Sequence, residues 1–144
     1  MLFLWIWNDK MTCTAKYIES TKCLIRVWSG AVTVNDLATS YLDVLQIVNQ
    51  GKHISSMLMD FSGVTENDLR IVDLLKIADS TKILSSIMPD MIFVVVAPDS
   101  STIDLVKIWK AIALQIGWTI QVVETLERAE SWLCYKLGTT SIYE

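Results

Sequence analysis

The 144-residue chain contains 52% hydrophobic and 19% charged residues and has a net charge of −4. This composition excludes a disordered chain and predicts one globular domain, residues 1–144, with a sizeable core. Lysines and arginines are scattered singly, so nucleic acid is not expected as a partner. A single histidine, His53, and the absence of any C-x-x-C pair predict no metal site.

The chain starts with an apolar extension, residues 1–11. Its run of apolar residues at 2–7 includes Trp5 and Trp7. The run is much shorter than the roughly 20 residues that span a bilayer, and it lacks the basic start of a signal peptide, so no transmembrane segment is expected. Two alternatives remain: the extension packs on its own or a neighbouring subunit, or it lies outside the natural domain.

Residues 14–19 and 22–28 are rich in β-branched, aromatic and aliphatic side chains, which favour strands. The short connection between them predicts an antiparallel hairpin. Cys23 would then lie near Ile18, so no disulfide to Cys13 is expected. Three cysteines without such a pairing are typical of reduced thiols in a cytoplasmic protein.

An amphipathic pattern predicts a helix over residues 34–50. Thr33 and Asp36 resemble a capping box at its start, and Gly51 is expected to end it. The next strand is predicted to include the run ISSMLMDF at residues 54–61.

The strand ends in MDFSGV, in which Ser62 is a candidate nucleophile or phosphate acceptor. His53 precedes the strand and stands about 20 Å from Ser62 along an extended chain, which excludes a Ser-His pair. We expect Asp60 and Ser62 to turn the chain towards the next helix, with Gly63 permitting the bend.

A second helix is expected within residues 65–86. Four apolar side chains with core spacing are expected to face the sheet: Leu69, Val72, Leu75 and Ile83. Four positions are polar: Arg70, Asp73, Lys76 and Asp79. Residues 91–97, MIFVVVA, are continuously apolar and predict a central parallel strand buried on both faces.

A third helix is expected to be capped by Ser100 or Ser101 and to end at Gly117. Its polar side chains form only a narrow stripe, so the helix is apolar over most of its circumference. One interpretation is a central core helix. The other is an apolar interface for a partner subunit or an apolar ligand, formed by Ile108, Trp109 and Ile112.

Residues 118–124 predict a fifth strand, and Thr125 is expected to cap a last helix that ends at Gly138. The order of elements predicts an α/β fold with its core at about residues 14–137. The expected sheet has five strands and is mixed but mainly parallel, with an antiparallel N-terminal strand and four helices.

Three stretches resemble a bacterial family of small domains: DFSGV after the third strand, VVVAP in the fourth, and VVETLERAESWL near the C-terminus. The family is STAS-like (sulfate transporter and anti-sigma-factor antagonist) and is also described as CRAL-TRIO-like. The resemblance covers roughly residues 14–133. It implies a STAS-like fold and a regulatory or protein-interaction function.

The resemblance also bears on phosphorylation. In anti-sigma-factor antagonists a partner kinase phosphorylates a serine in an aspartate-serine-serine-glycine block at the start of the following helix. The matching stretch here is residues 68–71, with leucine, arginine and isoleucine after the aspartate. The resemblance therefore implies that the usual phospho-acceptor is missing and that Ser62 does not occupy its position.

Ligands of open parallel sheets usually bind at the carboxyl ends of the strands. Hydroxyls beside helix N-termini favour anions there, although helix capping explains most such residues without a ligand. An acid–base pair of Asp60 with Asp99 is a further alternative. The candidate ligand or partner site comprises Asp60, Ser62, Gly63, Asp99, Ser100, Ser101 and Thr125.

The sequence contains no recognisable catalytic constellation, so neither an enzyme nor a cofactor is expected. The leading hypothesis is a non-enzymatic STAS-like module that binds another protein or itself, as a homodimer. The alternative is an apolar small-molecule or lipid-binding domain of CRAL-TRIO-like type, which requires a cavity of several hundred Å³ beside the third helix. The candidate apolar interface comprises Trp5, Trp7, Ile108, Trp109 and Ile112.

Overall fold

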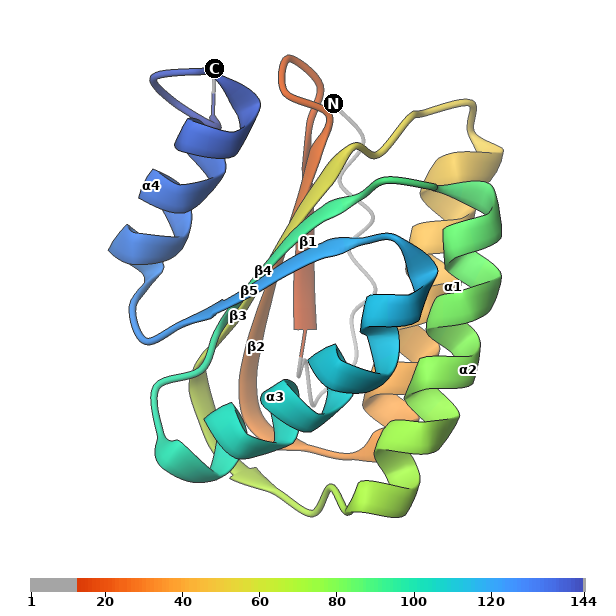
Figure 1. The fold of residues 1–144 in the computed structure, drawn as a ribbon, viewed down its shortest axis with the longest axis vertical. Helices are drawn as coiled ribbons and strands as arrows, with labels where there is room; N and C mark the ends of the chain where they lie inside the picture. Colours follow the sequence, from red (N-terminus) through yellow and green to blue (C-terminus); the bar gives the residue numbers. More distant parts are fainter. Residues whose placement is uncertain (1–12, 144) are drawn as a thin grey trace.

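The computed structural model describes residues 13–143 of the chain (Figure 1). The predictions made for Trp5, Trp7 and the rest of the N-terminal extension lie outside these residues. Within the described part, no helix is both long enough and apolar enough to cross a membrane.

Five strands form one sheet in the order β1-β2-β3-β4-β5. β1 pairs antiparallel with β2, and Ile18 lies opposite Cys23 as predicted. All the other pairs are parallel, so the predicted mixed, mainly parallel sheet is confirmed. The strands are β1 (Cys13–Ile18), β2 (Cys23–Val32), β3 (Ser56–Asn67), β4 (Ile92–Val96) and β5 (Thr119–Val123).

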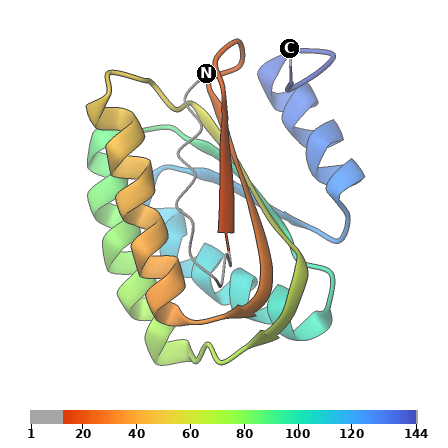
Figure 2. The ribbon, with the colours of Figure 1, turned by 180° about the vertical axis from the view of Figure 1, so that it is seen from behind.

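Four helices cover the two faces of this sheet unequally. Three of them pack on one face and the last one packs on the other, as Figures 1 and 2 show from opposite sides. Parallel strands joined by crossovers of one hand place their connecting helices on the same face. The helices are α1 (Val34–Asn49), α2 (Ile71–Ile87), α3 (Ser100–Ala113, followed by the 3₁₀ turn Leu114–Ile116) and α4 (Leu126–Leu137).

The helix ends agree largely with the sequence. Thr33 and Asp36 form the predicted capping box of α1. Thr125 caps α4 by accepting a hydrogen bond from the backbone N–H of Arg128. At α3 the predicted cap was wrong: the cap is Asp99, whose Oδ1 accepts a hydrogen bond from the backbone N–H of Thr102 at 2.8 Å, so both following serines lie inside the first turn.

The core has two layers because the sheet is buried on both faces. Phe93 and Val95 of β4 pack against α1–α3, whereas Val94 and Val96 pack against α4. This alternation confirms that the continuously apolar run at residues 91–97 is a central strand covered on both faces.

The predicted turn at MDFSGV is wrong, because β3 continues through it to Asn67. Val27 pairs with Asp60 and Ser29 with Gly63, so two residues of β3 lie opposite Trp28 alone. Such a bulge bends a strand without ending it. The bend brings Gly63 so close to β2 that an added Cβ would lie 3.0 Å from the Trp28 carbonyl oxygen.

The inward face of α2 also differs from the prediction. Val72, Leu75 and Ile83 are 50%, 52% and 63% exposed. Asp73 is buried instead, because its carboxylate accepts a hydrogen bond from the backbone N–H of Arg70 and closes the start of the helix. The side chains that α2 buries are Asp73, Leu74, Ile77, Ala78, Thr81 and Leu84.

The close approach at the bulge predicts that Gly63→Ala destabilises the protein. The new methyl must displace the Trp28 backbone or part the strands, at a cost of about 1–3 kcal/mol in the free energy of unfolding. Ser62→Ala, its neighbour and control, loses only local hydrogen bonds and is expected to cost at most about 1 kcal/mol. Urea denaturation of both variants checks this, and equal losses would contradict the contact.

Two adjacent leucines of α2 test which face of the helix is buried. Leu74 is 4% exposed, so Leu74→Ala is expected to cost about 2–5 kcal/mol by leaving a cavity in the core. Leu75→Ala removes a half-exposed side chain and is expected to cost less than about 1 kcal/mol. The unfolding midpoints of the two variants measure this difference. A larger loss of stability in Leu75→Ala than in Leu74→Ala would support the orientation of α2 predicted from the sequence.

Candidate functional site

The predicted strand-end residues are spread over both faces of the sheet. Asp60 lies on the face covered by α4, where Thr125 begins that helix. Asp99, with Ser100 and Ser101 after it, begins α3 on the opposite face. The strand order runs from β1 to β5 without a reversal, so the sheet lacks the switch point at which such folds form a ligand crevice.

Local hydrogen bonds account for four of the predicted polar residues: Asp60, Ser62, Asp99 and Thr125. Asp60 is 7% exposed, and its Oδ1 accepts from the backbone N–H of Ser62 at 2.8 Å and from the Ser62 hydroxyl at 2.5 Å.

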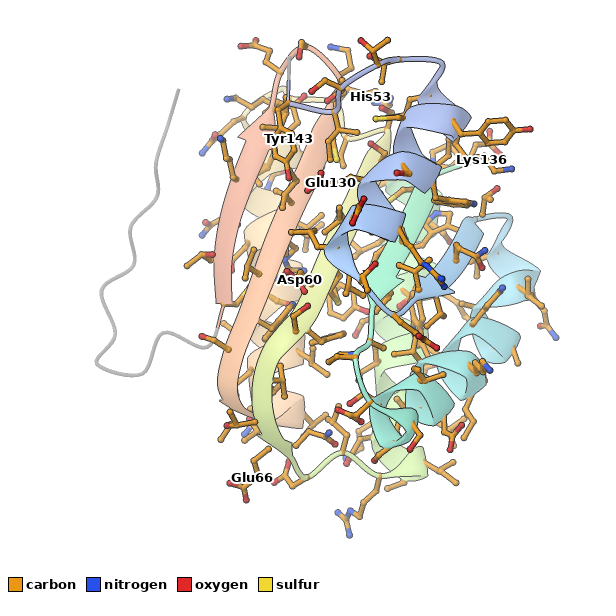
Figure 3. The ribbon with its side chains drawn as sticks, turned by 90° about the vertical axis from the view of Figure 1, so that its left-hand side faces the viewer. His53, Asp60, Glu66, Glu130, Lys136 and Tyr143 are labelled. Atoms are coloured by element: carbon orange, nitrogen blue, oxygen red, sulfur yellow. The ribbon has the colours of Figure 1, made fainter. Side chains whose placement is uncertain are left out.

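His53 lies towards one end of the sheet and Glu66 towards the other, with Asp60 between them (Figure 3). Residues 13–143 contain no cluster of metal-ligating side chains.

A second polar contact fixes the end of the chain to α4. The Tyr143 hydroxyl donates a hydrogen bond to Oε1 of Glu130 at 2.7 Å (Figure 3). Burial, with the Glu130 carboxylate as a further cause, raises the pKa of Tyr143 from 10.0 to about 12. The Thr21 hydroxyl donates to the carbonyl of Ile142 at 2.7 Å, which ties the same segment to the β1–β2 turn.

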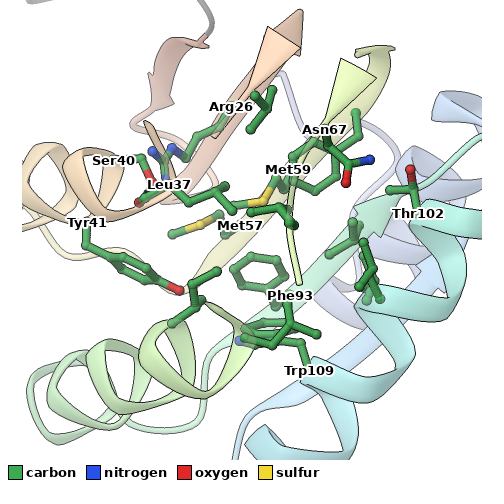
Figure 4. Close-up of a pocket in the computed structure, with 18 of the residues that line it drawn as sticks. Arg26, Leu37, Ser40, Tyr41, Met57, Met59, Asn67, Phe93, Thr102 and Trp109 are labelled. Carbon is green, nitrogen blue, oxygen red and sulfur yellow. Dashed lines mark hydrogen bonds between the residues drawn. The ribbon is translucent and has the colours of Figure 1, made fainter. Parts of the chain in front are cut away.

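A small cavity lies between the sheet and helices α1–α3 (Figure 4). Its volume is about 80 Å³, well below the roughly 300–1,000 Å³ of pockets that hold drug-sized ligands. The walls are almost entirely apolar and include Met57, Met59, Phe93 and Trp109. A cavity of this size and lining has room for a small apolar body and not for a long-chain lipid.

The predicted apolar interface on α3 is mostly turned inward. Trp109 is 7% exposed, and its ring centroid lies 5.4 Å from that of Phe93. Ile108 and Ile112 are half-buried on either side of it. Trp109 thus contributes to the core and to the cavity wall in the described part of the chain.

Sequence reasoning missed Arg26, the one charged residue of the described chain that lines the cavity. It is 1% exposed, and it lies on the same face of β2 as Leu24 and Trp28. The signal was present in the sequence, because alternation along KCLIRVW places Arg26 on the face of these two residues.

Sequence reasoning also missed an exposed apolar surface on α2, here called the α2 apolar face. Five large side chains of this helix are between 45% and 63% exposed in the described structure. Because apolar residues occur on both sides of α2, the helix buries one stripe and presents the other. The α2 apolar face comprises Ile71, Val72, Leu75, Ile83 and Ile87.

The raised pKa of Tyr143 predicts a loss of stability in alkaline solution. The folded protein holds the phenol proton more tightly than the unfolded chain, so this contribution is complete below pH 10 and is lost as the pH rises towards about 12. Tyr143→Phe is expected to flatten the decline in the free energy of unfolding across this window. Tyr135→Phe, at an 81% exposed position, is the control. An unchanged slope in Tyr143→Phe would contradict the assignment.

Comparison with solved structures identifies the fold. The anti-sigma-factor antagonist SpoIIAA in its unphosphorylated form aligns with a TM-score of 0.52 at 11% identity, over 84% of this chain and 96% of that chain. The Bacillus cell fate determinant SpoIIAA in its phosphorylated form aligns with a TM-score of 0.49 at 9% identity, over 84% and 98% of the two chains. No family model matches the sequence, and no curated protein is similar to it. The first of these two alignments shows that the chain has a STAS-like fold, as the resemblance implied.

Proposed function

We propose that this protein is a non-enzymatic regulatory module that binds another protein through the α2 apolar face. The observation that carries the proposal is the exposure of five large apolar side chains on one helix. A shared fold with SpoIIAA, which is described as an anti-sigma-factor antagonist and so acts on another protein, supports the same class of function.

The geometry of the α2 apolar face suits a protein partner. Val72, Leu75 and Ile83 recur at intervals of three and eight residues, which places them along one side of the helix. Because these side chains are already about half-buried, burying the remainder in a complex contributes about 1 kcal/mol each, roughly half of the value for a fully exposed side chain. Exposed Lys76 and Asp79 lie on the same helix, and such charges typically form the polar rim of a protein interface.

The start of α2 bears on how the module would be regulated. Arg70 is the N-cap residue and Ile71 the first helical residue, which supports the inference that residues 68–71 match the phospho-acceptor block that the family carries at the start of this helix. None of these residues is a serine or a threonine. We infer that partner binding here does not depend on phosphorylation at this position.

A second copy of the same chain is the partner that we propose to test first, because self-association is the most direct test of the interface. Closed two-fold dimers are the commonest oligomers and need only one self-complementary surface. An exposed apolar helix face meets that need. The alternative of an apolar small-molecule or lipid-binding domain is favoured only by the cavity, whose volume of about 80 Å³ suits a ligand much smaller than a long-chain lipid. A cytoplasmic location remains a prediction from the cysteine content.

A charge-introducing double variant tests the proposed interface. Leu75→Glu with Ile83→Glu places two carboxylates on the α2 apolar face and is expected to weaken self-association by at least about 100-fold in Kd. Light scattering coupled to size-exclusion chromatography measures the dimer over a range of concentrations. Tyr135→Glu on α4, at the opposite face of the sheet, is the control and should leave the dimer intact.

Because the substituted side chains are exposed, the unfolding midpoint of the double variant should stay close to that of the wild type. A dimer that persists in the double variant would contradict the proposed interface. If the wild type stays monomeric at about 0.1 mM and binds no apolar dye, the α2 apolar face is not an interaction surface. That result would overturn the proposal that the protein binds a partner through this face.

A further inference from the structure

Arg26 is a buried, positively charged residue that has no ion-pair partner among residues 13–143. Arg26 is 1% exposed, and neither its Nε nor its Nη2 has a hydrogen-bond partner in the structure as described. The ion pair found among residues 13–143 is formed by Arg70 and Asp73, at 3.9 Å. An unpaired buried charge is strongly destabilising, because the interior does not replace the water that the charge has lost.

The groups around Arg26 do not neutralise it. Burial raises the pKa of Cys13 although the charge of Arg26 and a hydrogen bond with it act in the opposite direction, so the thiol keeps its proton at neutral pH and brings no negative charge to Arg26. Asp43 on α1 is half-buried and beyond ion-pair distance, and burial raises its pKa although the charge of Arg26 acts in the opposite direction. The Tyr41 hydroxyl is already hydrogen-bonded to Thr81 at 2.9 Å.

Aromatic rings supply part of the missing stabilisation. The guanidinium carbon of Arg26 lies 5.4 Å from the Trp28 ring centroid, a cation–π contact. The Nε1–H of Trp28 and that of Trp109 also have no acceptor within the described residues. Arg26 and both tryptophans lie on the face of the sheet covered by α1–α3. On this side of the sheet every unpartnered buried polar atom is thus a donor, and the group that would satisfy them is an acceptor.

The cavity provides room for such an acceptor. Arg26 lines the cavity together with Met57, Met59, Phe93 and Trp109 (Figure 4). One water needs about 10–15 Å³ by the same measure, so 80 Å³ holds a body of roughly five to eight non-hydrogen atoms, and a slightly larger one once flexible methionines adjust. A guanidinium binds a carboxylate through two parallel hydrogen bonds.

We propose that the cavity binds a small monocarboxylate with an apolar body, either a medium-chain fatty acid or an aromatic acid. Its carboxylate pairs with Arg26, and its body packs against the methionines and aromatic rings of the cavity. This inference is independent of the α2 apolar face, because the site lies inside the domain. A failure of one proposal leaves the other standing.

Octanoate and benzoate are the probes, with 1-octanol as a comparator of similar shape that carries no charge. Titration calorimetry and thermal unfolding of the full chain are expected to show binding of at least one acid, with a higher Tm. Arg26→Met keeps the length and the apolar stem but removes the charge, so acid binding should weaken at least about tenfold. Arg128→Met on exposed α4 is the matched control and should bind like the wild type.

The ligand-free variants give a second readout. Because Arg26→Met removes an unpaired buried charge, its Tm without ligand should equal or exceed that of the wild type. The wild type should bind 1-octanol more weakly than octanoate, whereas Arg26→Met should lose that preference. Binding of octanoate or benzoate that is the same in Arg26→Met as in the wild type would overturn the assignment of Arg26.

A carboxylate of the chain itself would make a ligand unnecessary, and two variants test for one. Asp43→Asn and Asp9→Asn, the latter outside the described residues, should leave the Tm nearly unchanged if Arg26 awaits a ligand. A clear fall in Tm in either variant, with no binding of octanoate or benzoate to the wild type at about 10 mM, would overturn the proposal.

Discussion

Burial of the parallel strands on both faces is the constraint on which the rest of the structure depends. Three crossovers of the same hand place α1, α2 and α3 together on one face. The other face is then left to α4 and the short segment after it, which buries Ile142 against the sheet. The division of the molecule into a three-helix side and a one-helix side follows from the order of the elements.

The two sides have different chemistry. On the α4 side, two polar side chains are matched locally, Asp60 by Ser62 and Tyr143 by Glu130, whereas the buried Ser56 hydroxyl has no partner in the described structure. On the three-helix side, Arg26 faces an apolar cavity, and its Nε and Nη2 have no hydrogen-bond partner in the described structure. The exposed surface of the three-helix side is also distinctive, because α2 presents a second apolar stripe to solvent. The two features that invite a partner or a ligand therefore both belong to the three-helix side.

Local signals in the sequence were sufficient for most of the fold. Alternation, caps and the continuously apolar β4 predicted the order of elements, the sheet and its burial. The prediction was wrong where the outcome depends on distant residues: the bulge opposite Trp28 exists only because β2 pairs with β3 there. The orientation of α2 was ambiguous, because both of its sides are apolar. Arg26 was missed since arginine is rarely buried, although its neighbours in the strand indicated an inward position.

In the described structure, α4 and the segment after it are the elements that cover one face of the sheet, and this affects local unfolding. One helix and the segment after it shield Leu58, Val94 and Val96, and a Thr21–Ile142 hydrogen bond ties that segment to the β1–β2 turn. The C-terminal segment is thus the element that can detach without breaking a strand pair. In amide hydrogen exchange, α4 should form its own low-energy opening unit, separate from the β2–β4 centre of the sheet. Its detachment would expose one whole face of a parallel sheet, so premature release of α4 is also the most direct route to aggregation.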